Sequence, residues 1–291
     1  MKTRHSGPKL TATMGQRLSE HARRVFDEID LRRDVSSVAT AEQLRSFLRA
    51  RKLPAYDAVL ELEETASGFK FWPGTALGVQ SAIQAMEAGG ERLSADRLER
   101  VDGRVALPIL YCGDLSYWMD ERGRLHFVDL CPPVSTYDSF LQFVEHHAFV
   151  AERREVGQTR TKEGWHCVHT SSRVGPELSA RLEAPSFEPA TGERLRLWWR
   201  DPLVIEEQLF GQFGEWTRAY TPSASDAAAA LIAMHEVAPG MVSWSGPDAA
   251  RHRGRAQLFH RIDGTSEGGQ AEIYEVWERA GACWIVRAGQ P

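Results

Sequence analysis

The sequence predicts an α+β protein built from two domains, and three observations predict this class. Apolar residues recur at helical spacing through the first 90 positions, short apolar runs with tight turns fill positions 107–129, and the second half alternates strand-like runs with one alanine-rich helix. A length of 291 residues is enough for two domains of ordinary size. We expect helices packed on a mostly antiparallel sheet, followed by a smaller α+β domain.

Amphipathic helices are predicted before the first strands. Residues 16–30 carry apolar side chains on one helical face. Thr40 with Gln43 three positions later forms a capping-box pattern, which begins a second helix. A third helix is expected with Pro54 in its first turn and Gly68 near its end. These helices supply the apolar faces that the predicted sheet needs.

The segment 107–150 is the most informative part of the chain. Its polar, glycine-containing stretch 121–124 is typical of a hairpin turn. We expect Ser135 to cap a helix in which Phe140 and Phe143 begin the apolar stripe. Because this segment places no nucleophile beside a base, we interpret it as a folding module with a binding face. The strands predicted within it are Leu107–Tyr111, Tyr117–Asp120 and Leu125–Asp129.

The second half is predicted to be rich in strands around one helix, which we expect over 226–237 with Ser225 as its cap. The composition shifts over 151–192 to charged residues and then to Ser, Pro and Gly, so we place the domain boundary there. The predicted strands are Trp165–Thr170, Leu195–Trp199, Leu203–Phe213, Glu215–Tyr220, Val242–Trp244, Ala256–Ile262, Ala271–Arg279 and Cys283–Arg287.

These patterns give a domain organisation with four parts. We expect a disordered tail over 1–13, a first domain over 14–150, a linker region over 151–192 and a C-terminal α+β domain over 193–291. Met14 is an alternative start to Met1.

Four segments of the first half together resemble a known family, namely Thr40–Arg51, Leu53–Phe69, Gly113–Val128 and Ser139–Val144. Their order of two helices, a hairpin within a β-meander and a closing helix is similar to that of the SMI1/KNR4 (SUKH) superfamily. The resemblance implies helices packed on an antiparallel sheet over 14–150. It also implies an immunity function, since bacterial members of that superfamily mostly neutralise toxins.

Composition narrows the class of protein. A net charge of −5 and a pI near 6.1 argue against a general nucleic-acid binder. The basic residues near the start are not followed by the apolar region of a signal peptide, and the longest apolar run, Ala227–Met234, is too short to span a bilayer. Four scattered cysteines are typical of reduced thiols. We expect a cytoplasmic protein that binds neither nucleic acid nor membrane.

The sharpest candidate for metal or catalytic chemistry is the run from His166 to His169. On a strand only Cys167 and His169 share a face, and a second ligand pair with suitable spacing is missing from the sequence. We therefore predict an edge strand without a metal, and we expect no cofactor and no enzymatic activity. An enzyme of unrecognised type that uses His166 and His169 with a carboxylate remains an alternative.

The predicted partner-binding residues combine acidic and aromatic side chains. The acidic ones form either a solvated face or a rim that steers a basic, nuclease-type toxin toward the protein. The aromatic ones belong to the residue types that contribute most binding energy at interfaces. The residues are Glu63, Asp114, Tyr117, Trp118, Asp120 and Glu121.

The sequence thus predicts a non-enzymatic immunity or interaction protein that neutralises a cognate toxin by protein–protein contact. A regulatory scaffold, whose partners are host proteins, is a further alternative beside the enzyme. The identity of the partner and the oligomeric state stay open at this point.

Overall fold

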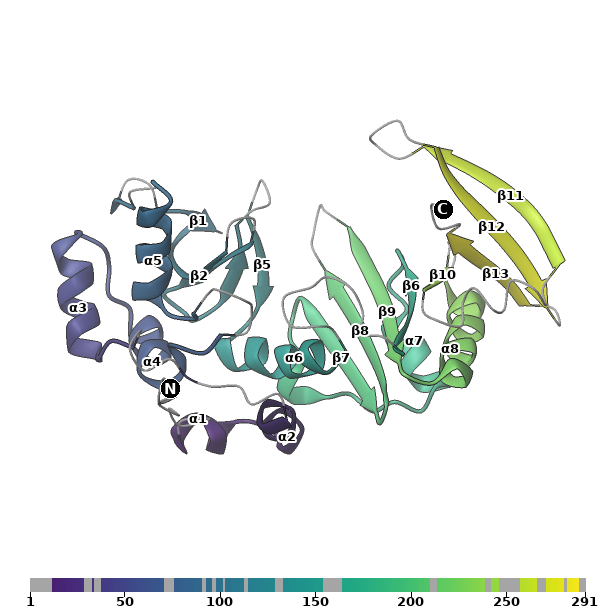
Figure 1. The fold of residues 1–291 in the computed structure, drawn as a ribbon, viewed down its shortest axis with the longest axis horizontal. Coiled ribbons are helices and arrows are strands. Elements are labelled where there is room, and N and C mark those ends of the chain that lie inside the picture. The colour runs from purple at the N-terminus through teal and green to yellow at the C-terminus, as the bar shows by residue number, and fades with distance from the viewer. Residues whose placement is uncertain are drawn as a thin grey trace, which may run out of the picture. The chain divides into compact units, whose positions relative to one another are not determined.

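The structure, a computed structural model, confirms the α+β class (Figure 1). Two compact units are present, one formed by residues 1–158 with 192–194 and the other by 159–191 with 195–291. Each unit has its own sheet and its own helices. The residues described are 12–28, 33, 38–70, 76–90, 93–95, 98–101, 103–112, 115–128, 133–153, 164–209, 214–238, 242–245, 257–265, 271–279 and 282–287.

The first and third predicted helices of the first unit differ from those in the structure. The helix expected over 16–30 is divided, because Ser19 caps the second piece: the Ala22 amide donates to Ser19 Oγ at 3.1 Å. Pro54 lies before the third predicted helix, which begins only at Asp57. The helices are α1 (Ala12–Arg17), α2 (Glu20–Glu28), α3 (Ala41–Ala50), α4 (Asp57–Ala66), α5 (Val79–Ala88) and α6 (Phe140–Arg153).

The sheet of the first unit is an antiparallel meander with the strand order β1-β2-β3-β4-β5. The expectation that Ser135 caps a helix is wrong. Ser135 lies in a strand opposite His126, and Ser139 caps α6 by accepting the Gln142 amide at 3.1 Å. The strands are β1 (Arg100–Val101), β2 (Arg104–Cys112), β3 (Leu115–Asp120), β4 (Leu125–Phe127) and β5 (Val134–Tyr137).

An aromatic cluster joins this sheet to α6. The ring of Phe143 on α6 meets Tyr117 of β3 edge-on at 5.3 Å and Tyr137 of β5 at 5.2 Å, measured between ring centroids. On α6, Phe149 also stacks on His21 of α2 with centroids 4.0 Å apart. Because α6 touches the sheet and α2 at once, it is the central element of the first unit.

The second unit has an eight-stranded sheet in the order β11-β12-β13-β10-β6-β9-β8-β7. Neighbouring strands are antiparallel except β10 and β13, which are parallel. The elements are β6 (His166–Thr170), α7 (Gly175–Arg181), η3 (Glu188–Ala190), β7 (Leu195–Arg200), β8 (Leu203–Leu209), β9 (Glu215–Thr221), α8 (Ala224–Val237), β10 (Val242–Ser245), β11 (Gln257–Thr265), β12 (Ala271–Arg279) and β13 (Ala282–Arg287).

Three details of the second unit differ from the sequence interpretation. The cap of α8 is Ser223, whose Oγ accepts the Asp226 amide at 3.2 Å, and not Ser225. Residues 164–191, assigned to the linker, contain β6, α7 and η3 and group with the second unit. The composition there suggested a connection. The prediction of an edge strand from His166 to His169 is also wrong, because β6 lies between β10 and β9 inside the sheet.

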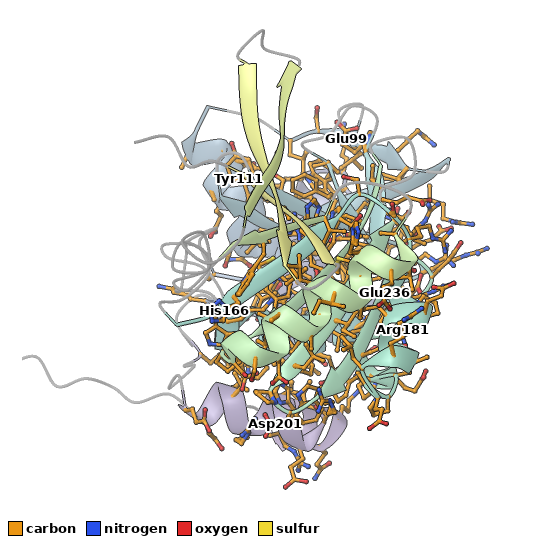
Figure 2. All side chains as sticks on the ribbon, turned by 90° about the vertical axis from the view of Figure 1, so that its right-hand side faces the viewer. Glu99, Tyr111, His166, Arg181, Asp201 and Glu236 are labelled. Carbon is orange, nitrogen blue, oxygen red and sulfur yellow. The ribbon has the colours of Figure 1, made fainter. Side chains whose placement is uncertain are left out.

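Helices α7 and α8 cover one face of the second sheet. Their apolar side chains, such as Leu178 and Leu231, pack with Val168, Ile205 and Trp244 from three strands. Figure 2 shows α8 in front of the strands, with Arg181 of α7 next to Glu236 of α8, and these two residues form an ion pair. The core of the second unit lies between the two helices and the sheet.

The two adjacent tryptophans of β7 point to opposite faces of the sheet. Trp198 belongs to the core beneath the helices, whereas Trp199 meets Phe187 edge-on at 5.7 Å.

In the described part of the chain, none of the helices has both the length and the apolar character that crossing a bilayer requires.

Candidate functional site

The turn between β3 and β4 is held by a buried carboxylate. Asp120 is fully buried, and its Oδ1 accepts the amides of Arg122 at 2.8 Å and Arg124 at 3.0 Å. Gly123 supplies the left-handed backbone that the turn needs, with φ of 80°. A short polar side chain that binds backbone amides two and four residues ahead fixes the turn locally. The tip of the hairpin is therefore a rigid surface feature.

The same carboxylate begins a row of polar groups across three strands. Asp120 Oδ2 lies 3.2 Å from His126 Nε2, an electrostatic contact that is not aligned as a hydrogen bond. His126 Nδ1 and Ser135 Oγ share a hydrogen bond at 3.0 Å. The row runs from β3 through β4 to β5, because strand pairing sets His126 opposite Ser135. It links the hairpin to the last strand of the meander.

The order carboxylate, imidazole, hydroxyl is also that of a hydrolytic triad. Here Asp120 and His126 are at most 1% exposed. A general base must be within hydrogen-bond reach of the proton that it takes from a substrate complex, and such burial leaves no approach to the imidazole. We interpret the row as a structural network. Sequence reasoning missed it because its members are distant in sequence and meet only through strand pairing.

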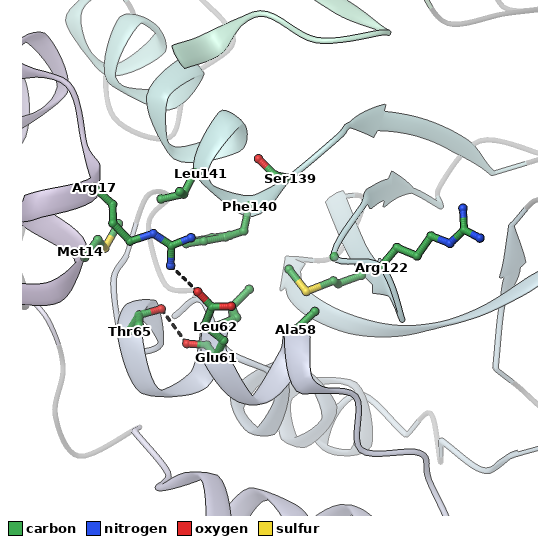
Figure 3. Close-up of a pocket in the computed structure, with 12 residues that line it drawn as sticks. Met14, Arg17, Ala58, Glu61, Leu62, Thr65, Arg122, Ser139, Phe140 and Leu141 are labelled. Carbon is green, nitrogen blue, oxygen red and sulfur yellow. Dashed lines mark hydrogen bonds and ion pairs between the residues drawn. The ribbon is translucent and has the colours of Figure 1, made fainter. Parts of the chain in front are cut away.

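A half-open hollow lies where the hairpin tip meets three helices of the first unit (Figure 3). Its volume is about 170 Å³. Ala58 of α4 lies directly under the turn, since a Cβ added to Gly123 would be 3.4 Å from the Ala58 Cβ. The lining residues are Met14, Arg17, Ala58, Glu61, Leu62, Thr65, Met119, Arg122, Gly123, Ser139, Phe140 and Leu141.

The floor of the hollow is apolar and its charged groups lie at the margin. Phe140 and Leu141 reach it from the start of α6, and both are half-exposed. Arg17 of α1 forms an ion pair with Glu61 of α4, with side chains 43% and 55% exposed. On the other side, Figure 3 shows Arg122 with its guanidinium pointing away from the hollow. The arrangement suits an apolar group that enters and a polar group that stays outside.

Glu63 lies on the inner side of α4 and is fully buried. Its Oε2 accepts the Val79 amide at 2.8 Å, so it caps the N-terminus of α5. Burial raises the pKa of the Glu63 carboxyl to about 7, although the amides of Val79, Ala39 and Gln80 and the charge of Arg33 oppose this rise. Glu63 therefore joins two helices inside the first unit.

A second buried glutamate, Glu145, caps the start of α2. Glu145 of α6 accepts the Ser19 amide through Oε1 and the Ser19 hydroxyl through Oε2, both at 2.6 Å. Burial raises the pKa of the Glu145 carboxyl, and the hydrogen bonds from Ser19 counter it. The starts of α5 and α2 are thus each held by a carboxylate from another helix, Glu63 of α4 and Glu145 of α6.

The predicted partner-binding residues are mostly not at the surface. The prediction that Glu63, Trp118 and Asp120 contact a partner is wrong, because their side chains are at most 4% exposed. Tyr117 is half-buried in the aromatic cluster with Phe143. Among the predicted residues that the structure describes, only Glu121 is exposed, and it lies at the hairpin tip. Asp114 lies outside the described residues.

The residues of the enzyme alternative are on opposite faces of β6. His166 faces the core, where its Nδ1 accepts the Trp244 indole N–H at 3.3 Å. His169 lies on the other face, and burial together with the charge of Arg218 lowers the pKa of His169 to about 4. The two imidazoles cannot act on one group from these positions. Among the described residues, no three His, Cys, Asp or Glu side chains come together as a metal site would require.

Comparison of the chain with known proteins identifies no relative. No family model matches the chain, and neither a curated protein nor a solved structure matches it. A function is therefore proposed from the geometry of the first unit.

Proposed function

We propose that this chain is a non-enzymatic recognition protein of the immunity type, which binds a cognate protein toxin and neutralises it by contact. The contact surface is the hairpin tip between β3 and β4 together with the hollow beside it. The toxin loses activity because its functional surface is covered, and this chain forms and breaks no covalent bond.

The observation that carries the proposal is the hollow beside a hairpin tip that is held by hydrogen bonds of its own side chain. Asp120 fixes the hairpin tip through two backbone amides, and Glu145 fixes the junction of α2 with α6. A surface that is already in its binding conformation loses little conformational entropy when a partner docks. Interfaces gain most of their energy where an anchor side chain enters such a pocket.

The resemblance to the SMI1/KNR4 (SUKH) superfamily supports the same proposal. The segments that carry it include α4, the β3–β4 hairpin and the start of α6. Each of these elements contributes lining residues to the hollow. The part of the sequence that suggests an immunity function is therefore the part that forms the candidate contact surface.

The test is co-expression of the full chain with a toxin encoded beside it, with growth and complex formation measured together. We expect growth to be rescued and a complex to be isolated with the toxin. Rescue without a complex, or neither, contradicts the proposal. Capture of host proteins with no effect on the toxin favours the regulatory scaffold instead.

A further inference from the structure

We propose that the hollow binds one large apolar side chain of the partner protein, and that a carboxylate of the partner lies next to that anchor and pairs with an arginine at the margin. This inference rests on the proposed function and specifies the chemistry of the partner. It follows from the size, the lining and the charge of the hollow.

The size of the hollow fits one ring or one branched aliphatic group. Its volume is about 170 Å³. An engineered apolar cavity of roughly 150 Å³ binds a benzene molecule, so a phenyl side chain is of matching size. Two rings would not fit, and an alanine-sized group would leave most of the space empty. The anchor is therefore Phe, Leu or Met in size.

The lining selects an apolar anchor. Leu62 and Met119 form buried parts of the wall, and Phe140 and Leu141 are half-exposed. Burial of apolar surface contributes about 25 cal/mol per Å², and a filled pocket also regains the dispersion contacts that its walls lack while it is open. A polar anchor would lose its hydrogen bonds to water, and the apolar lining residues would offer few hydrogen bonds in exchange.

The charge at the margin selects an acidic neighbour. The charged lining residues are Arg17, Glu61 and Arg122, which carry a net positive charge, whereas the whole chain carries −5. Pairs as exposed as Arg17 with Glu61 contribute little to stability, so Arg17 is free to exchange its partner at low cost. Arg122 is exposed, and within the described residues no ion pair involves it. Arg17 and Arg122 lie on opposite sides of the hollow, and the Arg122 guanidinium points away from it, so an incoming carboxylate pairs with one guanidinium at the margin (Figure 3).

This inference reverses the charge expected of the partner. The sequence suggested an acidic rim facing a basic toxin. However, Glu63 and Asp120 are buried, and their carboxylates accept hydrogen bonds from backbone amides. The remaining acidic residue of that set at the hairpin tip is Glu121, which does not line the hollow. We therefore expect the contact patch of the partner to be locally acidic around its apolar anchor, whatever its total charge.

The probe for this inference is acetyl-Gly-Asp-Phe-Gly-amide, titrated into the full ¹⁵N-labelled chain. We expect saturable amide shifts at Ala58, Gly123 and Leu141, with a dissociation constant in the millimolar range that short peptides reach. The matched peptide with Lys in place of Asp should bind at least about threefold more weakly, because like charges then meet at the margin. The peptide with Gly in place of Phe should produce no saturable shifts there. Absence of shifts around the hollow with the Asp-Phe peptide overturns the inference.

Two variants and a matched control complete the test. Arg122→Glu should reverse the preference between the Asp and Lys peptides, whereas Arg45→Glu, the same change on an exposed position of α3, should leave it as it is. Ala58→Trp fills the hollow and should abolish peptide binding. If Ala58→Trp does not fold by circular dichroism, the Arg122→Glu result decides alone. A preference that Arg122→Glu leaves unchanged overturns the inference.

The neutralisation assay separates this inference from the proposed function. If the wild-type chain rescues growth and Arg122→Glu and Ala58→Trp rescue it equally well, the anchor inference fails while the immunity function stands. If the wild-type chain never rescues growth, the immunity function fails, and the peptide titration still decides what the hollow binds.

Discussion

Asp120 and His126 face each other across β3 and β4, with 3.2 Å between Oδ2 and Nε2, and both side chains are buried. One carboxylate therefore holds the hairpin turn with Oδ1 and reaches the neighbouring strand with Oδ2. The shape of the hollow depends on this relationship, because Arg122 and Gly123 of the same turn line it.

Replacing Asp120 should destabilise the first unit. Asp120→Ala removes the acceptor of two partly buried turn amides and the carboxylate beside His126, and we expect a total loss of about 1–3 kcal/mol. Asp120→Asn retains an acceptor for the turn and should cost less. Urea denaturation measures the loss. The exposed neighbour change Glu121→Ala should have almost no effect, and equal losses for both residues would contradict the assignment.

Glu63 should make stability depend on pH. Its pKa is raised to about 7 in the folded state from 4.5, so the folded protein binds the proton more tightly than the unfolded chain. The free energy of unfolding should fall as pH rises from about 4.5 to about 7, by roughly 3 kcal/mol at most, and change little from this group above that range. Urea denaturation at a series of pH values measures the slope.

The matched control for this slope lies one position along the same helix. Glu63→Gln removes one titrating group and should reduce the slope between pH 4.5 and 7, whereas Glu64→Gln changes an exposed carboxylate and should retain the full slope. A Glu63→Gln protein with an unchanged slope would show that another group causes it.

The helix cap at the start of α2 should contribute measurably to the free energy of unfolding. Ser19→Ala removes the hydroxyl that accepts the Ala22 amide and that donates to Glu145 at 2.6 Å. Loss of a serine cap costs about 1 kcal/mol, and the partly freed buried carboxylate should add to this. Thermal denaturation gives the comparison with Ser46→Ala, an exposed serine within α3. Equal melting temperatures would refute the role of Ser19.

A methyl group at Gly175 should destabilise the second unit. A Cβ at this position would lie 2.5 Å from the Trp198 ring and 3.0 Å from Glu207 Oε2, and the Gly175 amide already donates to that oxygen at 3.0 Å. Overpacking of a core costs roughly 1–3 kcal/mol. Gly175→Ala should lower the urea midpoint, while the exposed Ala180→Ser should shift it little. A stabilised Gly175→Ala protein would contradict this packing.

The sequence predicted elements best where a local signal was strong. The capping box at Thr40 and Gln43 is present with both of its hydrogen bonds, so the start of α3 was predictable. The glycine in the stretch 121–124 correctly indicated the hairpin. Sequence patterns failed where two serines competed. Ser139 and Ser223 cap helices, while Ser135 lies in a strand whose Val134, Thr136 and Tyr137 favour extended backbone.

The site was less predictable than the fold, for a physical reason. From sequence alone, an acidic residue in a helix or a turn is predicted to be exposed to solvent. In the structure, the buried carboxylates of Glu63 and Asp120 accept hydrogen bonds from backbone amides. The Val79 amide reaches Glu63 only through tertiary packing, whereas Asp120 accepts the amides of its own turn. The hollow arises from α1, α4, α6 and a hairpin that are far apart in sequence.

The parallel contact between β10 and β13 marks a seam in the second sheet. It joins at a single residue pair, Ser243 with Ile285, while every other junction in the described sheet has four or more. The meander of β11, β12 and β13 is therefore joined to the rest of the sheet by few ladder bonds, and α8 packs against both β10 and β13. Amide protons of that meander should exchange with solvent through openings that leave the rest of the unit folded, so the C-terminal strands behave as a separate cooperative unit.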